Sequence, residues 1–174
     1  MSLHNAVMAI SLLVGGTEPA PGGADAATLN DMDKSFIDAI AAADRAEMEL
    51  SRSVAERSAH PAVRRVAQAI LAEDATNYHD LFKLCLARRY AIAPQLDERH
   101  RDVLRRVRTS ATRNDSAHAY LDALLVDEAR TSEMLERISS DATDGELARF
   151  AVQTAEMLRR HQQLVHELVV DSRG

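Results

Sequence analysis

Four polar or ionisable residues stand where long helical patterns should present apolar side chains. They are Glu47, Asp74, Glu128 and His161, and Asn77 follows Asp74 at a spacing that keeps both on one helix face. Carboxylates combined with an imidazole are ligands that suit Zn, Mn or Fe. The same groups can instead share protons or pair with one another when they are buried. What these residues can do therefore depends on whether the fold brings them together.

The segments around these residues have the three-and-four spacing of amphipathic helices. In the first segment the apolar stripe is formed by Phe36, Ile40, Leu50 and Val54, and Glu47 falls on it. The same spacing predicts four long helices, over residues 30–58, 60–89, 116–140 and 144–170. Each of the four predicted helices thus carries one polar position near the middle of its apolar stripe.

Local sequence signals mark the ends of these helices. Asn30, Asp31 or Asp33 can cap the first helix, and Pro61, which lacks an N–H, suits the first turn of the second. Pro94 interrupts the helical pattern, and a shorter helix is predicted over residues 95–109. Residues 113–116 offer caps for the third long helix, and Thr143 or Asp144 can cap the last one.

Short links between consecutive helices predict two helical hairpins. We therefore expect an all-α fold, a ferritin-like antiparallel four-helix bundle with the shorter helix as a crossover between the hairpins. Counting helical rise from the hairpin turns puts Glu47, Asp74 and Glu128 near one level, with His161 displaced by ~7 Å.

Two interpretations of this polar level remain open. The first is a metal site at Glu47, Asp74, Glu128 and His161 that holds an Fe, Mn or Zn ion, although the Glu-x-x-His spacing of di-metal bundles is missing. The second is a layer of polar side chains, Asn77 included, that satisfy one another through hydrogen bonds and bind no cofactor. The remaining helical histidines are expected at the surface or its boundary: His79, His100, His118 and His166.

Composition excludes several function classes. The net charge of -6 and the pI near 5.6 argue against nucleic-acid binding, which needs a concentrated basic face. The lone Cys85 permits no internal disulfide, and no Gly-x-Ser-x-Gly motif supports nucleophilic catalysis. A non-enzymatic protein is therefore favoured over an enzyme.

The N-terminal region is expected to differ from the bundle. Residues 1–29 combine an apolar run at 6–14, too short to span a bilayer, with a Pro/Gly-rich linker. The run is either the remnant of a secretory signal or a short helix docked on the bundle, where it could also mediate self-association into a homo-oligomer. The bundle is expected over residues 30–170, followed by a tail at 171–174.

Three stretches carry a resemblance to a known family. They read DKSFIDAIAAADRAEMELSRSVAERSAHPAVRRVAQAILAEDATNYHDLFKLC, AYLDALLVDEARTSEMLERI and ELARFAVQTAEMLRRHQQLVHEL, and together they extend over residues 33–168. This text resembles the bacterial domain-of-unknown-function 4142 proteins (DUF4142), a ferritin-like helical group commonly carried behind secretory signals. The resemblance implies a ferritin-like bundle and an exported, periplasmic or envelope-associated protein, with the cytoplasm as the alternative.

The chain departs from that family at two places. The family often has Asp-His in its second and third long helices, where this chain has Glu73-Asp74 and Asp127-Glu128, whereas the last-helix histidine is kept as His161. A metal at this level would therefore be one that accepts an oxygen-rich ligand set. The favoured function is a non-enzymatic exported binding or stress-associated module, and the alternative is a metal-binding protein with a carboxylate and histidine site in the bundle core.

Overall fold

The structure is a computed structural model that describes residues 29–93, 95–110 and 112–171. Within these residues the chain forms five helices and no strand: α1 (Asp31–Arg57), α2 (Pro61–Ala87), α3 (Glu98–Thr109), α4 (Arg113–Asp141) and α5 (Gly145–Asp171). The all-α prediction is confirmed. The predicted role of residues 1–28 as a signal remnant or docked helix lies outside the described residues.

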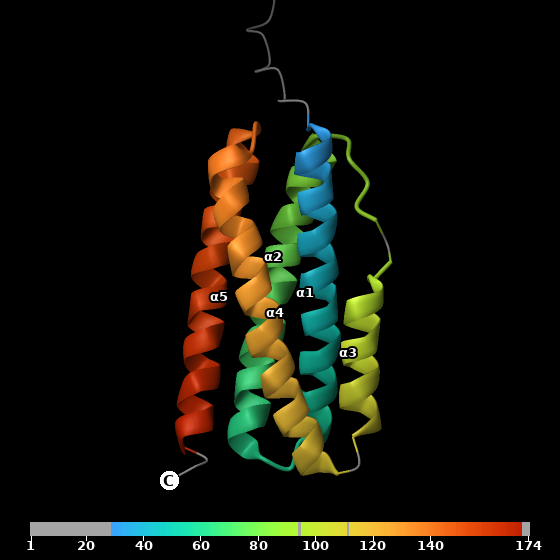
Figure 1. Ribbon diagram of the computed structural model, residues 1–174, viewed down its shortest axis with the longest axis vertical. Coiled ribbons are helices and arrows are strands. Elements are labelled where there is room, and N and C mark those ends of the chain that lie inside the picture. Colours follow the sequence, from blue (N-terminus) through green and yellow to red (C-terminus); the bar gives the residue numbers. More distant parts are fainter. Residues whose placement is uncertain (1–28, 94, 111, 172–174) are drawn as a thin grey trace, which may run out of the picture.

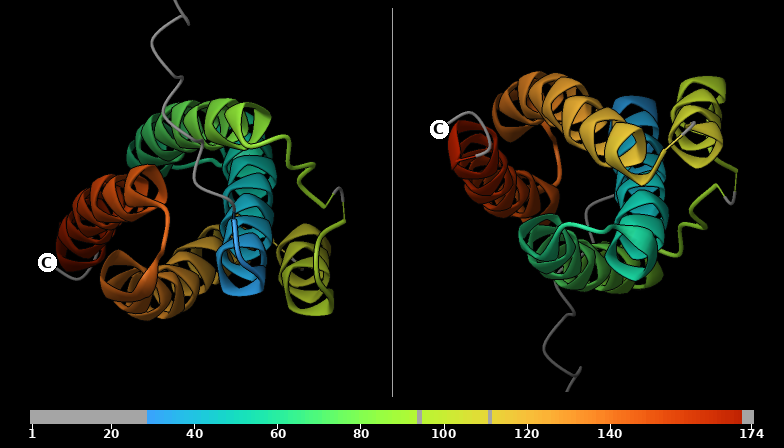
Figure 2. Two further views of the ribbon diagram at one scale, coloured as in Figure 1. Left: turned by 90° about the horizontal axis from the view of Figure 1, so that it is seen from above. Right: turned by 90° about the horizontal axis from the view of Figure 1, so that it is seen from below.

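The four long helices pack side by side, and α3 lies outside them against α1 and α4 (Figure 1). Helices α1 and α2 form one antiparallel hairpin, and α4 and α5 form the other. Figure 2, seen along the bundle, shows the order α1, α2, α5, α4 around a ring. The segment that contains α3 returns the chain to the end of the bundle where α4 begins. That the arrangement is ferritin-like in detail stays a prediction.

The ends of α1 and α2 follow the sequence signals. The Asn30 side chain accepts a hydrogen bond from the Asp33 backbone N–H at 2.8 Å, and the Asp33 carboxylate accepts one from the Asn30 N–H at 3.1 Å. Pro61 occupies the first turn of α2 as expected. After α2, Arg89 takes a left-handed conformation (φ 55°), which is uncommon for a residue with a side chain and ends the helix.

Two helix starts differ from the prediction by three residues. Helix α3 begins at Glu98 rather than at residue 95, because the Asp97 side chain caps it by accepting from the His100 N–H. Helix α4 begins at Arg113 rather than at residue 116. Ser116 cannot be its cap, since the Ser116 N–H already bonds to the Thr112 carbonyl as part of the first turn.

The core consists of two apolar clusters at different heights along the bundle. One cluster lies towards the α1 N-terminus and includes Phe36, Ile37, Ile40, Leu81, Leu135 and Leu147. The other lies towards the α1 C-terminus and includes Val63, Ile70, Leu104, Tyr120, Leu121 and Leu124. In every long helix the predicted polar residue falls between its contributions to the two clusters. The bundle therefore has a polar layer between two apolar half-cores.

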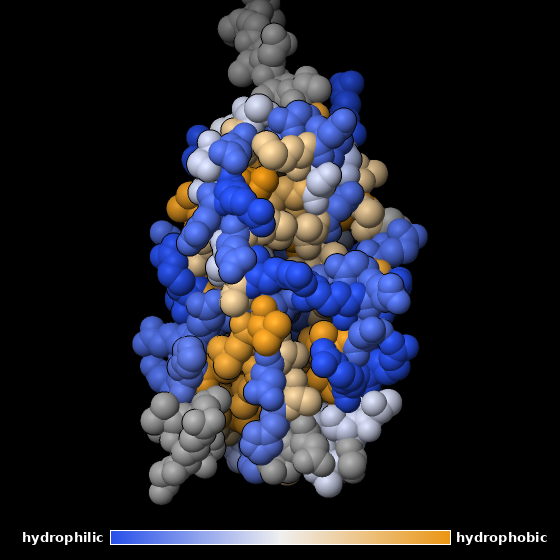
Figure 3. Space-filling view, in the orientation of Figure 1, coloured by the Kyte–Doolittle hydropathy of each residue, from blue (hydrophilic) through white to orange (hydrophobic). Residues whose placement is uncertain are grey.

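The outer face of the bundle is mixed in character. On the face seen in Figure 3, hydrophilic side chains lie across the middle of the molecule, and hydrophobic side chains are visible above and below them. None of the described helices is long and apolar enough to cross a membrane. Such a surface is typical of a helix bundle that buries one stripe of each long helix.

Candidate metal site in the polar layer

All four residues singled out in the sequence lie inside the bundle. Glu47 is 3% exposed, and Asp74, Glu128 and His161 are fully buried. Each comes from a different long helix, α1, α2, α4 and α5 in that order. The stripe pattern placed them correctly because a residue in register with an apolar stripe faces the same interior as its neighbours.

Glu47, Glu128 and His161 converge. One ligand atom from each lies within 4.8 Å of the others, and His161 Nδ1 is 3.6 Å from Glu128 Oε1. Asp74 stands beside this group, with Oδ1 at 3.9 Å from the same imidazole nitrogen. His161 is thus in direct reach of the acids, although rise counting displaced it by ~7 Å, because that count ignores side-chain length and helix tilt.

Three of the four polar residues have no side-chain hydrogen-bond partner among the described residues. Across the part of the chain that the structure describes, no partner is found for either carboxylate oxygen of Asp74, either oxygen of Glu128 or either ring nitrogen of His161. Buried polar groups in proteins are nearly always hydrogen-bonded, so this concentration of exceptions calls for an explanation. The expectation of a hydrogen-bonded layer is therefore met only in part.

Burial dominates the electrostatics of the three acids. It raises the pKa of Glu47 and of Asp74 well above their usual values, and repulsion from neighbouring carboxylates raises both further. Burial likewise raises the pKa of Glu128, although the imidazole of His161 offsets part of the rise. The buried acids are therefore stable only when they bind protons or when a cation balances their charge.

The hydrogen-bonded part of the layer involves a residue that sequence reasoning missed. Asn77 donates to the Asp44 carboxylate at 2.9 Å, and its carbonyl oxygen accepts from the Thr154 hydroxyl at 2.9 Å. Burial raises the pKa of Asp44 to about 8 despite the bond from Asn77. The signal was available, because Asp44 lies four residues after Ile40 and three before Glu47, on the same face of α1.

A second carboxylate of the layer is clamped by cationic groups. Asp127, next to Glu128, makes an ion pair with Arg99, and its Oδ2 lies 3.1 Å from His100 Nε2. Burial alone would raise the pKa of Asp127, but His100 and Arg99 together lower it. The expectation that His100 lies at the surface or its boundary is wrong: it is 3% exposed, because α3 turns it inward onto α4.

One carboxylate links the layer to the surface. Glu73, the neighbour of Asp74, has a side chain that is 36% exposed, and its Oε2 lies 3.7 Å from His161 Nε2. The same oxygen accepts a hydrogen bond from the Arg160 guanidinium at 2.9 Å. His161 therefore has buried acids near one ring nitrogen and a half-exposed acid near the other.

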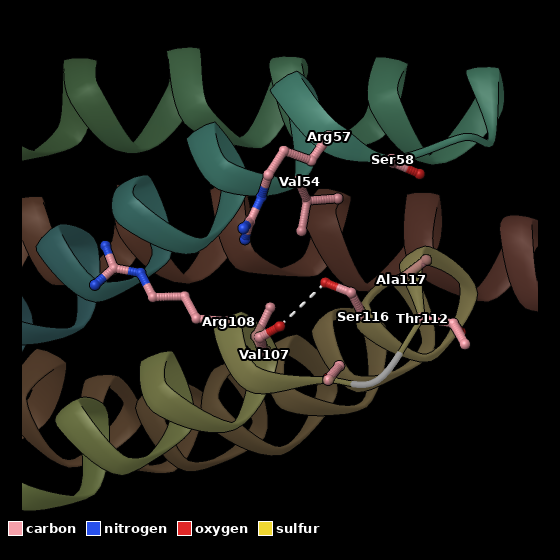
Figure 4. A pocket seen from close by; sticks show the side chains of 9 residues that line it. Val54, Arg57, Ser58, Val107, Arg108, Thr112, Ser116 and Ala117 are labelled. Atoms are coloured by element: carbon pink, nitrogen blue, oxygen red, sulfur yellow. Dashed lines mark hydrogen bonds between the residues drawn. The ribbon is translucent and has the colours of Figure 1, made fainter.

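A separate cavity of about 250 Å³ lies at the end of the bundle where α1 and α3 terminate and α4 begins (Figure 4). Its wall includes Arg57 and Arg108, but both guanidinium groups already have partners, Ser53 for the first and Glu49 for the second. None of the four residues of the polar layer lines it. The chemistry of the layer is therefore unrelated to this cavity.

Comparison with solved structures identifies a similar helical fold. The crystal structure of a DUF305 fragment from Deinococcus radiodurans matches with a TM-score of 0.75 and 13% sequence identity, over 83% of this chain and 99% of that one. At this identity the likeness concerns the fold alone. No curated protein matches the chain. The family described as Domain of unknown function (DUF4142) matches residues 18–168, and the chain belongs to this family.

Proposed function

We propose that the protein binds a divalent metal ion, Mn²⁺, Fe²⁺ or Zn²⁺, in the polar layer through Glu47, Glu128 and His161, with Asp74 as the fourth candidate ligand. The observation that carries this proposal is the set of buried, unpartnered oxygen and nitrogen atoms on Asp74, Glu128 and His161. Three carboxylates that face one another are costly to bury as anions. A dication at their centre would offset that cost.

The geometry is close to what one ion requires. Two ligands that each lie ~2.1 Å from the same ion are at most ~4.2 Å apart. The group of Glu47, Glu128 and His161 spans up to 4.8 Å. Side-chain shifts of about half an ångström would therefore bring all three ligand atoms to bonding distance.

The donor set favours a borderline cation. Imidazole suits Zn and Fe and carboxylate suits Mn, whereas Mg²⁺ and Ca²⁺ are usually bound by oxygen ligands alone. The site offers carboxylates together with the single nitrogen ligand His161. The proposal concerns binding, and it assigns no reaction to the bound ion.

Metal titration tests the proposal directly. The full chain is stripped of metal with a chelator and titrated with Mn²⁺, Zn²⁺ or, under anaerobic conditions, Fe²⁺, with bound metal measured by elemental analysis after dialysis. We expect about one equivalent of metal in the unaltered protein, because one group of ligands is present. Glu128→Gln and His161→Asn should each lower the affinity at least tenfold, since each removes a ligand.

Matched controls are available on the long helices of the bundle. Glu136→Gln on α4 and His79→Asn on α2 replace exposed residues of the same types and should leave the metal content unchanged. Sub-stoichiometric metal in the unaltered protein would contradict the proposal. So would an equal loss of affinity in the control variants.

The wider role that we propose is that of an exported, ferritin-like binding module without catalytic activity. Membership of the DUF4142 family and the helical fold support the ferritin-like description, and the apolar run at residues 6–14 motivates the export. Fractionation of cells that express the full-length gene product tests localisation. Recovery of the protein only in the cytoplasm would contradict export.

A further inference from the structure

The proposed site is enclosed, so an ion must cross the bundle wall to reach it. Glu47, the most exposed of the four candidate ligands, is only 3% exposed. A route by which the ion arrives presupposes the proposed metal site. A cation crosses an apolar wall with difficulty, and a route lined by a carboxylate lowers that barrier.

His161 lies between the buried acids and solvent. Its Nδ1 is 3.6 Å from Glu128 Oε1, and its Nε2 is 3.7 Å from Glu73 Oε2. The Glu73 side chain is 36% exposed, whereas that of His161 is fully buried. Glu73 on α2 and His161 on α5 therefore form a continuous line of ligand atoms from the surface to the interior.

The helix contacts favour the same position. The contact between α1 and α2 and that between α4 and α5 are each more extensive than the contact between α2 and α5. Glu73 and His161 face each other across this less extensive seam. A side chain there can move aside at lower cost than one inside either hairpin.

The other acid at the margin of the layer is less suited to admit a cation. Asp127 is 9% exposed and is held between Arg99 and His100. Among the described residues, the hydrogen bond to the Glu73 carboxylate comes from Arg160, whose side chain is 59% exposed. An exposed ion pair of this kind is weak and is screened by salt, so an incoming dication can compete for the Glu73 carboxylate.

We propose that Glu73 is the uptake carboxylate of the metal site: it captures a divalent cation at the α2/α5 seam and delivers it to His161. When no cation is present, the Arg160 guanidinium forms an ion pair with the Glu73 carboxylate. The cation displaces the Arg160 guanidinium from Glu73 Oε2, and the Glu73 side chain then brings it to the imidazole. The positive charge of Arg160 also repels cations that approach Glu73, so its removal should speed uptake.

Stopped-flow kinetics on the metal-free full chain test this route. Zn²⁺ uptake is followed by competition with a fluorescent zinc chelator, and release is followed after addition of excess chelator. Glu73→Gln should slow uptake about tenfold, because a capturing charge is lost. Glu73→Gln should slow release by a similar factor, since the ion leaves by the route through which it enters. Arg160→Ala should speed both.

Two control variants isolate the role of position from that of charge. Asp80→Asn removes an exposed acid from α2, and Arg159→Ala removes an exposed cation from α5. Both should leave the two rates unchanged. Rates in Glu73→Gln equal to those of the unaltered protein would overturn the uptake role of Glu73 but not the metal site. So would faster release with unchanged uptake, which would make Glu73 a ligand or a positioning residue. No Zn²⁺ uptake by the unaltered protein would overturn the metal site and the uptake role of Glu73 together.

Discussion

Two groups of buried carboxylates in this bundle differ in whether they have hydrogen-bond partners among the described residues. Asp144, fully buried before α5, accepts two hydrogen bonds from Arg88, at 2.8 and 3.1 Å, and two from the backbone N–H groups of Glu146 and Leu147. Burial alone would raise the pKa of Asp144, but these bonds lower it. Asp74 and Glu128 are equally buried, yet neither has a hydrogen-bond partner among the described residues.

The difference separates a structural acid from a candidate ligand. At Asp144 the fold supplies a cation and a helix N-terminus, so the charge ties the end of α2 to the start of α5. In the polar layer the acids face other acids and an imidazole. A charge arrangement that destabilises the metal-free fold is typical of sites kept for a function.

Breaking the ion pair between Arg88 and Asp144 should have the largest effect on stability. Arg88→Met leaves the Asp144 carboxylate buried without its cation and should lower the free energy of unfolding by roughly 3 kcal/mol. Urea denaturation at neutral pH measures this. Arg149→Met, which removes a 73% exposed arginine of α5, is the control and should change stability by less than ~0.5 kcal/mol. Equal effects in the two variants would show that the Asp144 pair is not structural.

The contribution to the free energy of unfolding should depend on pH with opposite signs in the two groups. Asp44 has a pKa of about 8 in the folded chain against 3.8 for an ordinary aspartate, so the folded chain holds more protons between these values. The contribution of Asp44 to the free energy of unfolding is fully present below pH 4. It is lost as pH rises towards 8, by roughly 1.4 kcal/mol per pH unit. Glu47 and Asp74 act in the same direction. Asp144, with a lowered pKa, instead loses its contribution as pH falls below about 4.

Thermal unfolding of the metal-free protein at a series of pH values between 5 and 8 checks this slope. Asp44→Asn should flatten it, because the amide cannot ionise and can still accept the bond from Asn77. The exposed Asp80→Asn is the matched control. A slope that Asp44→Asn leaves unaltered would mean that Asp44 titrates normally in the folded chain.

Neutralising an unsatisfied acid should stabilise the metal-free fold. Glu128→Gln keeps the size of the side chain and removes a buried charge, so we expect a gain of about 1 kcal/mol at pH 8. Asp144→Asn, the same kind of change at the satisfied site, should instead lose stability. Denaturation of both variants side by side at pH 8 measures the contrast. If Glu128→Gln destabilised as much as Asp144→Asn, the two groups would be equivalent.

The smallest effect is expected at an exposed ion pair. Arg108 and Glu49 join α3 to α1, and their side chains are 52% and 38% exposed. A double-mutant cycle with Arg108→Gln and Glu49→Gln should give a coupling energy below about 1 kcal/mol. A coupling as large as that of Arg88 with Asp144 would show that exposure does not decide the strength of these pairs.

Local signals account for what the sequence predicted well. The four long helices, the cap at Asn30 and the boundary at Pro61 depend on residues within one or two turns, and all three are found. The four polar positions follow from stripe register, and all are buried. The helices extend from Asp31 to Asp171, and the division into a bundle at residues 30–170 and flanking segments stays a prediction.

Contacts between distant segments account for what was missed. His100 is buried only because α3 docks beside α4 and brings it to Asp127, a pairing that no spacing within α3 encodes. Whether the acids are satisfied is also a property of several helices at once: Asn77 turns to Asp44 and Thr154 and leaves Asp74 without a bond. Stripe register places a side chain inside, but it does not choose its partner.

The division of the core into two apolar clusters has a consequence for cooperativity. Each cluster draws on all four long helices, and in each of these helices the polar residue of the layer lies between the contributions to the two clusters. Side chains there contribute little apolar burial, so the free energy of local opening should be lowest at mid-height in the metal-free protein. Amide hydrogen exchange should then be faster around Asp74 than around Ile70 or Leu81. A bound ion would join the halves into one unit and slow that exchange.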